Sequence, residues 1–167
     1  PTIHFLQAGL VAVCSCRIVR TCRIANNTFP AGGLGGRVQL QDWNGNVTWF
    51  YQYSNTLHSQ HHDALVLPNG NVLMIAWELK TRAEAIAEGR DSTLLQQRLW
   101  PDHLIEIEPT TPGAGNIVWE WHVWDHLVQE YDNNKPNFGV VADHPELVNL
   151  NYVKPGTTIH RDWLHTN

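Results

Sequence analysis

No stretch of the sequence stays apolar over the roughly 18 residues that a membrane-spanning helix needs. Charged residues are scarce as well, because Asp, Glu, Lys and Arg make up only 16% of the 167 residues. The formal net charge is -5 and no run of Lys or Arg occurs, whereas a nucleic-acid-binding domain usually carries a basic patch. We therefore expect no membrane insertion and no nucleic-acid partner.

Cysteine is rare, with Cys14, Cys16 and Cys22 close together. An odd number of cysteines at this spacing does not describe a disulfide framework. Cys14 and Cys16 resemble the start of a metal site, but no second Cys/His pair follows at zinc-finger spacing. We therefore favour a packing role for these side chains and predict no metal site here.

Several motifs of cofactor-dependent or hydrolytic enzymes are also absent. The sequence has no Walker phosphate loop, no Gly-x-Ser-x-Gly elbow and no His-Glu-x-x-His zinc motif. The glycine-rich segment 32–36 does not follow a strand and open a helix, as a phosphate-binding loop does. We therefore predict no cofactor.

Two residue types are abundant: the chain has 8 Trp and 10 His. Trp combines a large apolar area with one polar atom, which suits β-rich cores and ligand-facing surfaces. His is the side chain that changes charge near neutral pH. With 43% hydrophobic residues, the chain has the composition of a globular protein.

Three segments have the pattern of β-hairpins. Gly36–Tyr53 alternates polar and apolar residues on both sides of Asn44-Gly45, a strong hairpin signal. Asp63–Trp77 has two nearly continuous apolar arms around a Pro-Asn-Gly turn, a pattern typical of strands buried on both faces. His103–Trp124 has a turn rich in Pro and Gly. These signals predict an all-β fold.

Two of the hairpins resemble each other, since Gly45–Trp49 (GNVTW) matches Gly115–Trp119 (GNIVW). Repeated units of about 40–50 residues indicate a β-propeller, in which each blade packs against its neighbours. At about 45 residues per blade the chain holds about three blades, whereas propellers close with roughly four to eight. We therefore predict one incomplete domain over residues 1–167, a partial, open β-propeller of about three blades.

Two insertions, residues 80–100 and 125–156, interrupt this pattern. Within the first, Lys80–Arg90 is rich in Ala and Glu and contains Gly89 near its end, which predicts a short helix with a glycine C-cap. The second begins in a helix-like manner, and Pro145 predicts the first position of another helical turn. Long insertions of this kind often carry binding functions.

Histidines gather at two places where a blade strand is expected to begin. His61, His62 and Asp63 precede one apolar run, and Asp162 and His165 occupy a similar place later in the chain. In a propeller, such positions border the central channel, so imidazoles from separate blades can face one ligand. Each His can equally be a hydrogen-bonded structural group. Asp63 can orient an imidazole or cap a turn.

Five segments occur in the order of a known family: HHDALVLPNGNVLMIAWE, LWPDHLIEIEP, IVWEWHVWDHLVQEYD, VVADHPELVNLN and DWLHTN. From Thr21 to Asn167 the chain thereby resembles the bacterial arylsulfate sulfotransferase-like members of the arylsulfotransferase family. The resemblance implies a six-bladed propeller that transfers a sulfuryl group from a phenolic sulfate ester to a phenol, without a nucleotide sulfate. It also implies a sulfohistidine intermediate and a periplasmic or secreted location.

By matching position, the resemblance makes His61, His62 and His165 catalytic, in sulfate binding and leaving-group protonation, and Asp63 and Asp162 substrate-binding. The family's nucleophilic histidine and channel arginine come from blades after the DWLH segment, and nothing here matches them. We therefore expect the 167-residue chain to be inactive alone and to self-associate through open blade edges.

Two alternatives to this enzyme remain. One is a non-catalytic β-propeller that acts as a binding or scaffold module. The other is a metal site formed by His61, His62 and His165.

Overall fold

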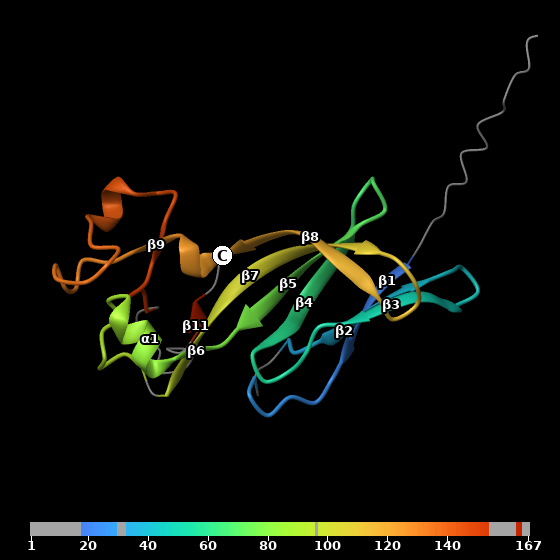
Figure 1. Cartoon of the computed structure of the whole chain (residues 1–167), viewed down its shortest axis with the longest axis horizontal. Coiled ribbons are helices and arrows are strands. Elements are labelled where there is room, and N and C mark those ends of the chain that lie inside the picture. The colour runs from blue at the N-terminus through green and yellow to red at the C-terminus, as the bar shows by residue number, and fades with distance from the viewer. Residues whose placement is uncertain (1–17, 30–32, 96, 154–162, 165–167) are drawn as a thin grey trace, which may run out of the picture.

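A computed structural model describes residues 18–29, 33–95, 97–153 and 163–164, and antiparallel strands are the main secondary structure of this part of the chain (Figure 1). The first sheet has the order β1-β2-β3. Its strands are β1 (Ile18–Arg23), β2 (Gly36–Gln41) and β3 (Val47–Gln52).

The second sheet is built around the long strand β7 (Arg98–Pro109). One edge of β7 pairs with β5 (Val72–Glu78), which in turn pairs with β4 (His58–Val66). Antiparallel β8 (Gly115–His122) also pairs with β7, and so do two short strands, β6 (Lys80–Thr81) and the parallel β11 (Trp163–Leu164). The four antiparallel strands β4, β5, β7 and β8 thus lie side by side.

The three predicted hairpins are confirmed as β2–β3, β4–β5 and β7–β8. Their turns explain why the sequence signals were reliable. Gly45 and Gly70 have φ angles of 84° and 89°, which a side chain disfavours. In the first turn the Asp42 carboxylate also accepts hydrogen bonds from the backbone N–H groups of Asn44 and Asn46, at 2.8 and 2.9 Å.

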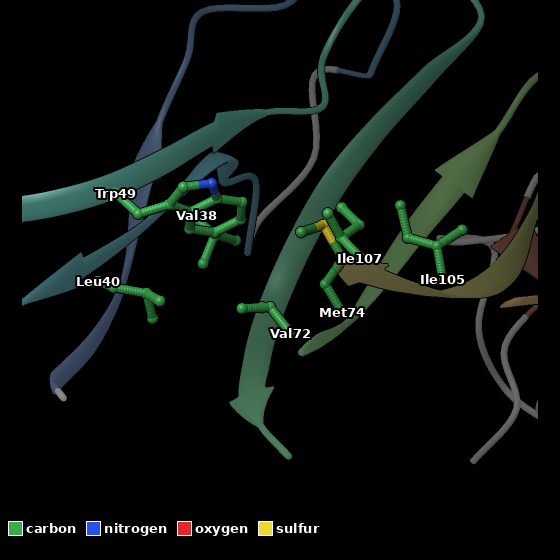
Figure 2. Packing of buried hydrophobic residues seen from close by; sticks show 7 residues of the cluster. All are labelled: Val38, Leu40, Trp49, Val72, Met74, Ile105 and Ile107. Carbon is green, nitrogen blue, oxygen red and sulfur yellow. The ribbon is translucent and has the colours of Figure 1, made fainter. Parts of the chain in front are cut away.

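The largest apolar core lies between the two sheets (Figure 2). Side chains of β2 and β3 face side chains of β5 and β7, and the buried members are Val38, Leu40, Trp49, Val72, Met74, Ile105 and Ile107. Each such side chain contributes about 1.5–3 kcal/mol when it is fully removed from water. This core fixes one face of the second sheet against the first sheet.

The first insertion contains the predicted helix, α1 (Arg82–Ala87). Thr81 caps its N-terminus and forms a capping box with Glu84, while Gly89 follows the C-cap with a φ angle of 99°. Ala85 of α1 packs into a second core formed by buried residues of the insertions and of β7: Leu95, Leu99, Val123, Leu127 and Leu150. The insertions are therefore anchored to the end of β7.

The helices predicted in the second insertion are wrong for its described part. The 3-10 turn η1 (Val123–Asp125) leads into that part. The part itself holds the 3-10 turn η2 (Val141–Asp143) and the strands β9 (Leu127–Val128) and β10 (Val148–Asn149), which pair in parallel. The fully buried Gln129 explains the outcome. Its amide accepts hydrogen bonds from the N–H groups of Tyr131 and Asp132 and donates to two carbonyls, so a side chain satisfies backbone groups that a helix would satisfy internally.

The all-β prediction is confirmed, whereas the partial, open propeller of about three blades remains a prediction. Among the residues that the structure describes, no helix is long and apolar enough to cross a membrane.

Candidate functional site

The His61–Asp63 segment lies inside β4, not at the start of a strand as predicted. β4 begins at His58, and its pairing with β5 shifts register between Gln60 and Ala64. The strand begins earlier than expected because His58, Ser59 and Gln60 already pair with β5. His61–Asp63 therefore form a bulge, a feature that often re-aims side chains beside functional sites.

The backbone of the bulge is strained at His62, and contacts with the segment around Gly33 hold it in place. His62 has a φ angle of 48°, in the left-handed region that residues other than glycine rarely adopt. Its backbone N–H donates to the carbonyl of Gly33 at 2.7 Å, and Leu34 forms a bridge with His61. The segment around Gly33 thus holds the bulge in place from outside the sheet.

Glycines are required where this segment meets the bulge. A Cβ atom on Gly33 would collide with the imidazole of His62, and one on Gly35 would collide with the amide of Gln60. The Gln60 amide accepts from the N–H of Gly36 at 2.9 Å and donates to the carbonyl of His61 at 2.8 Å. The glycine-rich stretch is therefore a close-packed support for the bulge.

His61 is almost completely buried, with 2% of its surface exposed. Its ring stacks on Trp77, with ring centroids 4.0 Å apart and an interplanar angle of 18°. Its Nε2 lies 3.2 Å from Oδ1 of Asp102, and its Nδ1 lies 2.8 Å from Nδ1 of His62. His61 therefore links a buried carboxylate to the neighbouring imidazole.

Aromatic side chains surround the buried contact between His61 and Asp102. Trp77 is fully buried, and its ring lies 6.2 Å from both Phe29 and Trp100, measured between centroids. Asp102 is 1% exposed, on a strand that pairs with β5 directly opposite Trp77. In such surroundings electrostatic interactions are stronger than in water.

The other two residues of the bulge are exposed. His62 and Asp63 both reach solvent, and Asp63 borders a shallow hollow of about 320 Å³. The apolar lining of this hollow includes Leu65, Leu73 and Ile75. Because Leu73, Ile75 and Trp77 alternate along β5, the hollow and the buried His61 lie on the same face of the sheet.

A second group of titratable side chains lies on the opposite face. Ala76 pairs with His103 while Trp77 pairs with Asp102, so adjacent residues of β7 point to opposite faces. His103 is buried, stacks on His122 at 5.0 Å, and its Nε2 lies 3.1 Å from the hydroxyl of Tyr53. This face packs against the first sheet.

Burial keeps His103 and Tyr53 neutral. Desolvation, with a smaller contribution from the charge on His122, lowers the pKa of His103 to about 3. Desolvation, followed by the charge on Glu120, raises the pKa of Tyr53 to about 12. Both groups are therefore uncharged at neutral pH, as suits packing between two sheets.

The depressed pKa of His103 predicts a loss of stability in acid. An unfolded His103 binds a proton below its ordinary pKa of 6.5, whereas the folded one does so only near 3. The free energy of unfolding should therefore fall as the pH drops below about 6.5, by about 2 kcal/mol from this group at pH 5. Urea titrations at pH 7 and pH 5 measure the difference.

Urea titrations of His103→Gln at the same two pH values measure the contribution of His103 alone. The free energy of unfolding of this variant should fall less between pH 7 and pH 5 than that of the wild type. His144→Ala, which changes an exposed histidine paired with Glu146, should follow the wild type. An unchanged pH dependence in His103→Gln would contradict the assignment.

The remaining predicted site residues, Asp162 and His165, lie outside the described residues. Between them, β11 pairs its backbone with Trp100 and Pro101 of β7. Asp102 is the next residue of β7. His58 is the first residue of β4, and its ring stacks on that of Tyr53, with centroids 3.8 Å apart.

Asp102 is the functional candidate that the sequence interpretation missed. It stands in the quoted segment LWPDHLIEIEP, but nothing in its spacing relates it to His61. Asp63, the predicted orienting carboxylate, is exposed, and its side chain makes no hydrogen bond to an imidazole within the described part of the chain. Only strand pairing brings Asp102 beside the histidines.

Within the described ranges, no group of three or more His, Cys, Asp or Glu side chains has the geometry of a metal site. The proposed third ligand, His165, is outside these ranges. A His61–His62–His165 metal site therefore stays a prediction.

Comparison with known proteins supplies one match. A family model described as Arylsulfotransferase (ASST) matches residues 25–167. Searches of curated proteins and of solved structures returned no match.

Proposed function

The chain belongs to the arylsulfotransferase family, and we propose that the intact protein transfers a sulfuryl group from a phenolic sulfate ester to a phenol. The transfer would use no nucleotide sulfate and no cofactor. The family match covers most of the chain, including both segments in which histidines were predicted to act.

The observation that carries the proposal is the exposed imidazole of His62. The protein holds this residue in a left-handed conformation inside a bulge, and strained residues of this kind cluster at functional sites. A phenolate leaves a sulfate ester more easily when a positioned acid gives it a proton. His62 is the only residue of the bulge that combines an exposed ring with a buried partner on that ring.

In the proposed reaction, Nε2–H of His62 donates its proton to the ester oxygen as the S–O bond breaks. The sulfuryl group passes to a histidine nucleophile, as the family resemblance implies. In the second half, Nε2 of His62 takes the proton of the acceptor phenol as its oxygen attacks sulfur and the bond between sulfur and the nucleophilic histidine breaks. The protein thereby returns to its starting state.

The other predicted residues have supporting roles in this proposal. His61 is buried, so we assign it to holding His62 rather than to touching substrate. Asp63, exposed beside the apolar hollow, and Asp162 would contact the substrate, and His165 would bind sulfate oxygens. Pairing of β11 with β7 supports a common site, because Leu164 pairs with Pro101, the residue that precedes Asp102 in β7.

A propeller architecture is part of the same proposal. The first sheet covers one face of the second sheet, and the opposite face carries an apolar hollow. A propeller blade packs on both faces, so this arrangement fits a blade that meets a further neighbour. Self-association of the 167-residue chain and an exported location also remain proposals, which light scattering and cell fractionation test.

The direct test is an assay of the intact protein with 4-nitrophenyl sulfate as donor and phenol as acceptor. We expect nitrophenol release to depend on phenol, with phenyl sulfate detected by mass spectrometry in equal amount. Release without an acceptor product would indicate hydrolysis. If neither product forms while calorimetry shows binding of the aryl sulfate, the binding-module alternative is correct.

A further inference from the structure

Asp102, His61 and His62 form a row of polar side-chain atoms that runs from the sheet interior to solvent. Asp102 Oδ1 lies 3.2 Å from His61 Nε2, and His61 Nδ1 lies 2.8 Å from His62 Nδ1. Exposure rises along the row, since Asp102 and His61 are 1% and 2% exposed and His62 reaches solvent. A change of proton at the buried end is therefore transmitted to the exposed ring.

The short Nδ1–Nδ1 distance restricts the protonation states. Two N–H groups repel at this separation, and two lone pairs gain nothing from it, so a single proton lies between the two Nδ1 atoms. The Asp102 carboxylate, 3.2 Å from Nε2 of His61, favours a proton on that nitrogen. Both contacts are satisfied when the row holds three protons, with the shared proton on either Nδ1, and also when it holds two. The nearby Asp102 carboxylate favours the three-proton arrangement that places the charge on His61.

In the first arrangement, His61 is an imidazolium that donates to Asp102 and to Nδ1 of His62, which leaves the His62 proton on Nε2. In the second, His61 is neutral and Nδ1 of His62 carries the shared proton, which leaves Nε2 of His62 free to accept. The arrangements differ by one proton. They correspond to the acid and base forms that leaving-group protonation requires.

The surroundings make the first arrangement accessible. A buried imidazolium is costly unless a counter-charge is close, and the Asp102 carboxylate provides one. The face of Trp77, stacked 4.0 Å from the His61 ring, also attracts a cation. The pairing of β5 with β7 sets Asp102 directly opposite Trp77, so both of these groups are held by regular strand pairing.

We propose that Asp102 is a positioning residue that, through His61, sets which nitrogen of His62 carries a proton. This inference deepens the proposed function and depends on it for its catalytic meaning. When Nε2 of His62 gives its proton to the departing phenolate oxygen, Nδ1 of His62 takes the shared proton from His61. His61 becomes neutral and keeps its Nε2–H toward Asp102, so the row loses one proton in total.

Nitrogen NMR of the intact protein with ¹⁵N-labelled histidine tests this directly, because protonated and unprotonated ring nitrogens have well-separated shifts. In the wild type we expect a proton on Nε2 of His61 and a single proton shared between the two Nδ1 atoms. A His61 with an unprotonated Nε2 would overturn the inference. This measurement needs neither substrate nor a variant.

The variant Asp102→Asn provides a second test. The amide can donate to Nε2 of His61, which moves the His61 proton to Nδ1 and the His62 proton to Nε2. We expect this change of tautomer in the spectrum, and at least a tenfold fall in kcat with a smaller change in KM, because transfer of the shared proton to His62 would leave His61 without a ring proton. The matched control is Asp143→Asn, which changes an exposed carboxylate and should leave the histidine tautomers and kcat unchanged.

The NMR and kinetic experiments test the proposed function and the role of Asp102 separately. If the intact protein transfers no sulfuryl group, the proposed function fails, but the tautomers of His61 and His62 still decide the inference. If transfer occurs and Asp102→Asn leaves both the tautomers and kcat as in the wild type, the role of Asp102 is refuted while the function stands.

Discussion

Replacing His62 with asparagine should lower the turnover number for sulfuryl transfer by about 10²–10⁴-fold, the usual contribution of a positioned acid or base. Asparagine is the informative choice because it tolerates the left-handed backbone at this position, where φ is 48°. The bulge therefore keeps its shape while the imidazole is lost. Steady-state kinetics with 4-nitrophenyl sulfate and phenol measure the change.

The matched control is His144→Ala, which removes an exposed imidazole on the second insertion. Its turnover should equal that of the wild type. A sulfate ester with a better leaving group should show a smaller loss of turnover in His62→Asn, because the departing phenolate then needs less help from an acid. Unchanged turnover in His62→Asn would remove His62 from the chemistry.

Replacing Trp77 with alanine should reduce the free energy of unfolding by about 3–5 kcal/mol. Trp77 is fully buried, and its ring contacts Phe29, His61 and Trp100, so the truncation leaves a cavity that three aromatic neighbours cannot fill. Denaturant titration of the purified protein measures the loss. The stacked His61 should also lose its fixed orientation, so its NMR signals should broaden or shift.

Trp43→Ala is the matched control for size and chemistry. Trp43 lies in the β2–β3 turn and is 73% exposed, so its truncation should change stability by no more than about 0.5 kcal/mol. A loss below about 1 kcal/mol in Trp77→Ala would mean that the aromatic cluster relaxes around the gap. The support assigned to Trp77 beneath His61 would then be wrong.

Local signals in the sequence predict the hairpins correctly, because alternation and turn glycines act within a few residues of each other. The short helix was also predictable, since Gly89 stops it and the Ala-rich segment favours it. The helices expected in the second insertion were wrong because one buried side chain, Gln129, competes for the backbone groups of its loop. Such a bond depends on tertiary burial, which the local pattern does not contain.

The candidate site was predictable only in part. His61 and His62 stand next to each other in the sequence, so their shared location was evident, but their different burial was not. Period-two alternation predicts that neighbours in a strand face opposite sides, whereas the bulge allows their Nδ1 atoms to approach within 2.8 Å. Asp102 comes from another strand, and its proximity to His61 depends on the β5–β7 register.

The central position of β7 has a consequence for how this protein folds. The β4–β5 and β7–β8 hairpins join residues that are close along the chain, so each can form early and independently. Joining them across the first insertion, through β5 and β7, requires closing a longer loop. Parallel pairing with β11 spans a still longer segment, so we expect assembly to proceed outward from β7. His61 would then reach its place beside Asp102 only after the two hairpins have met.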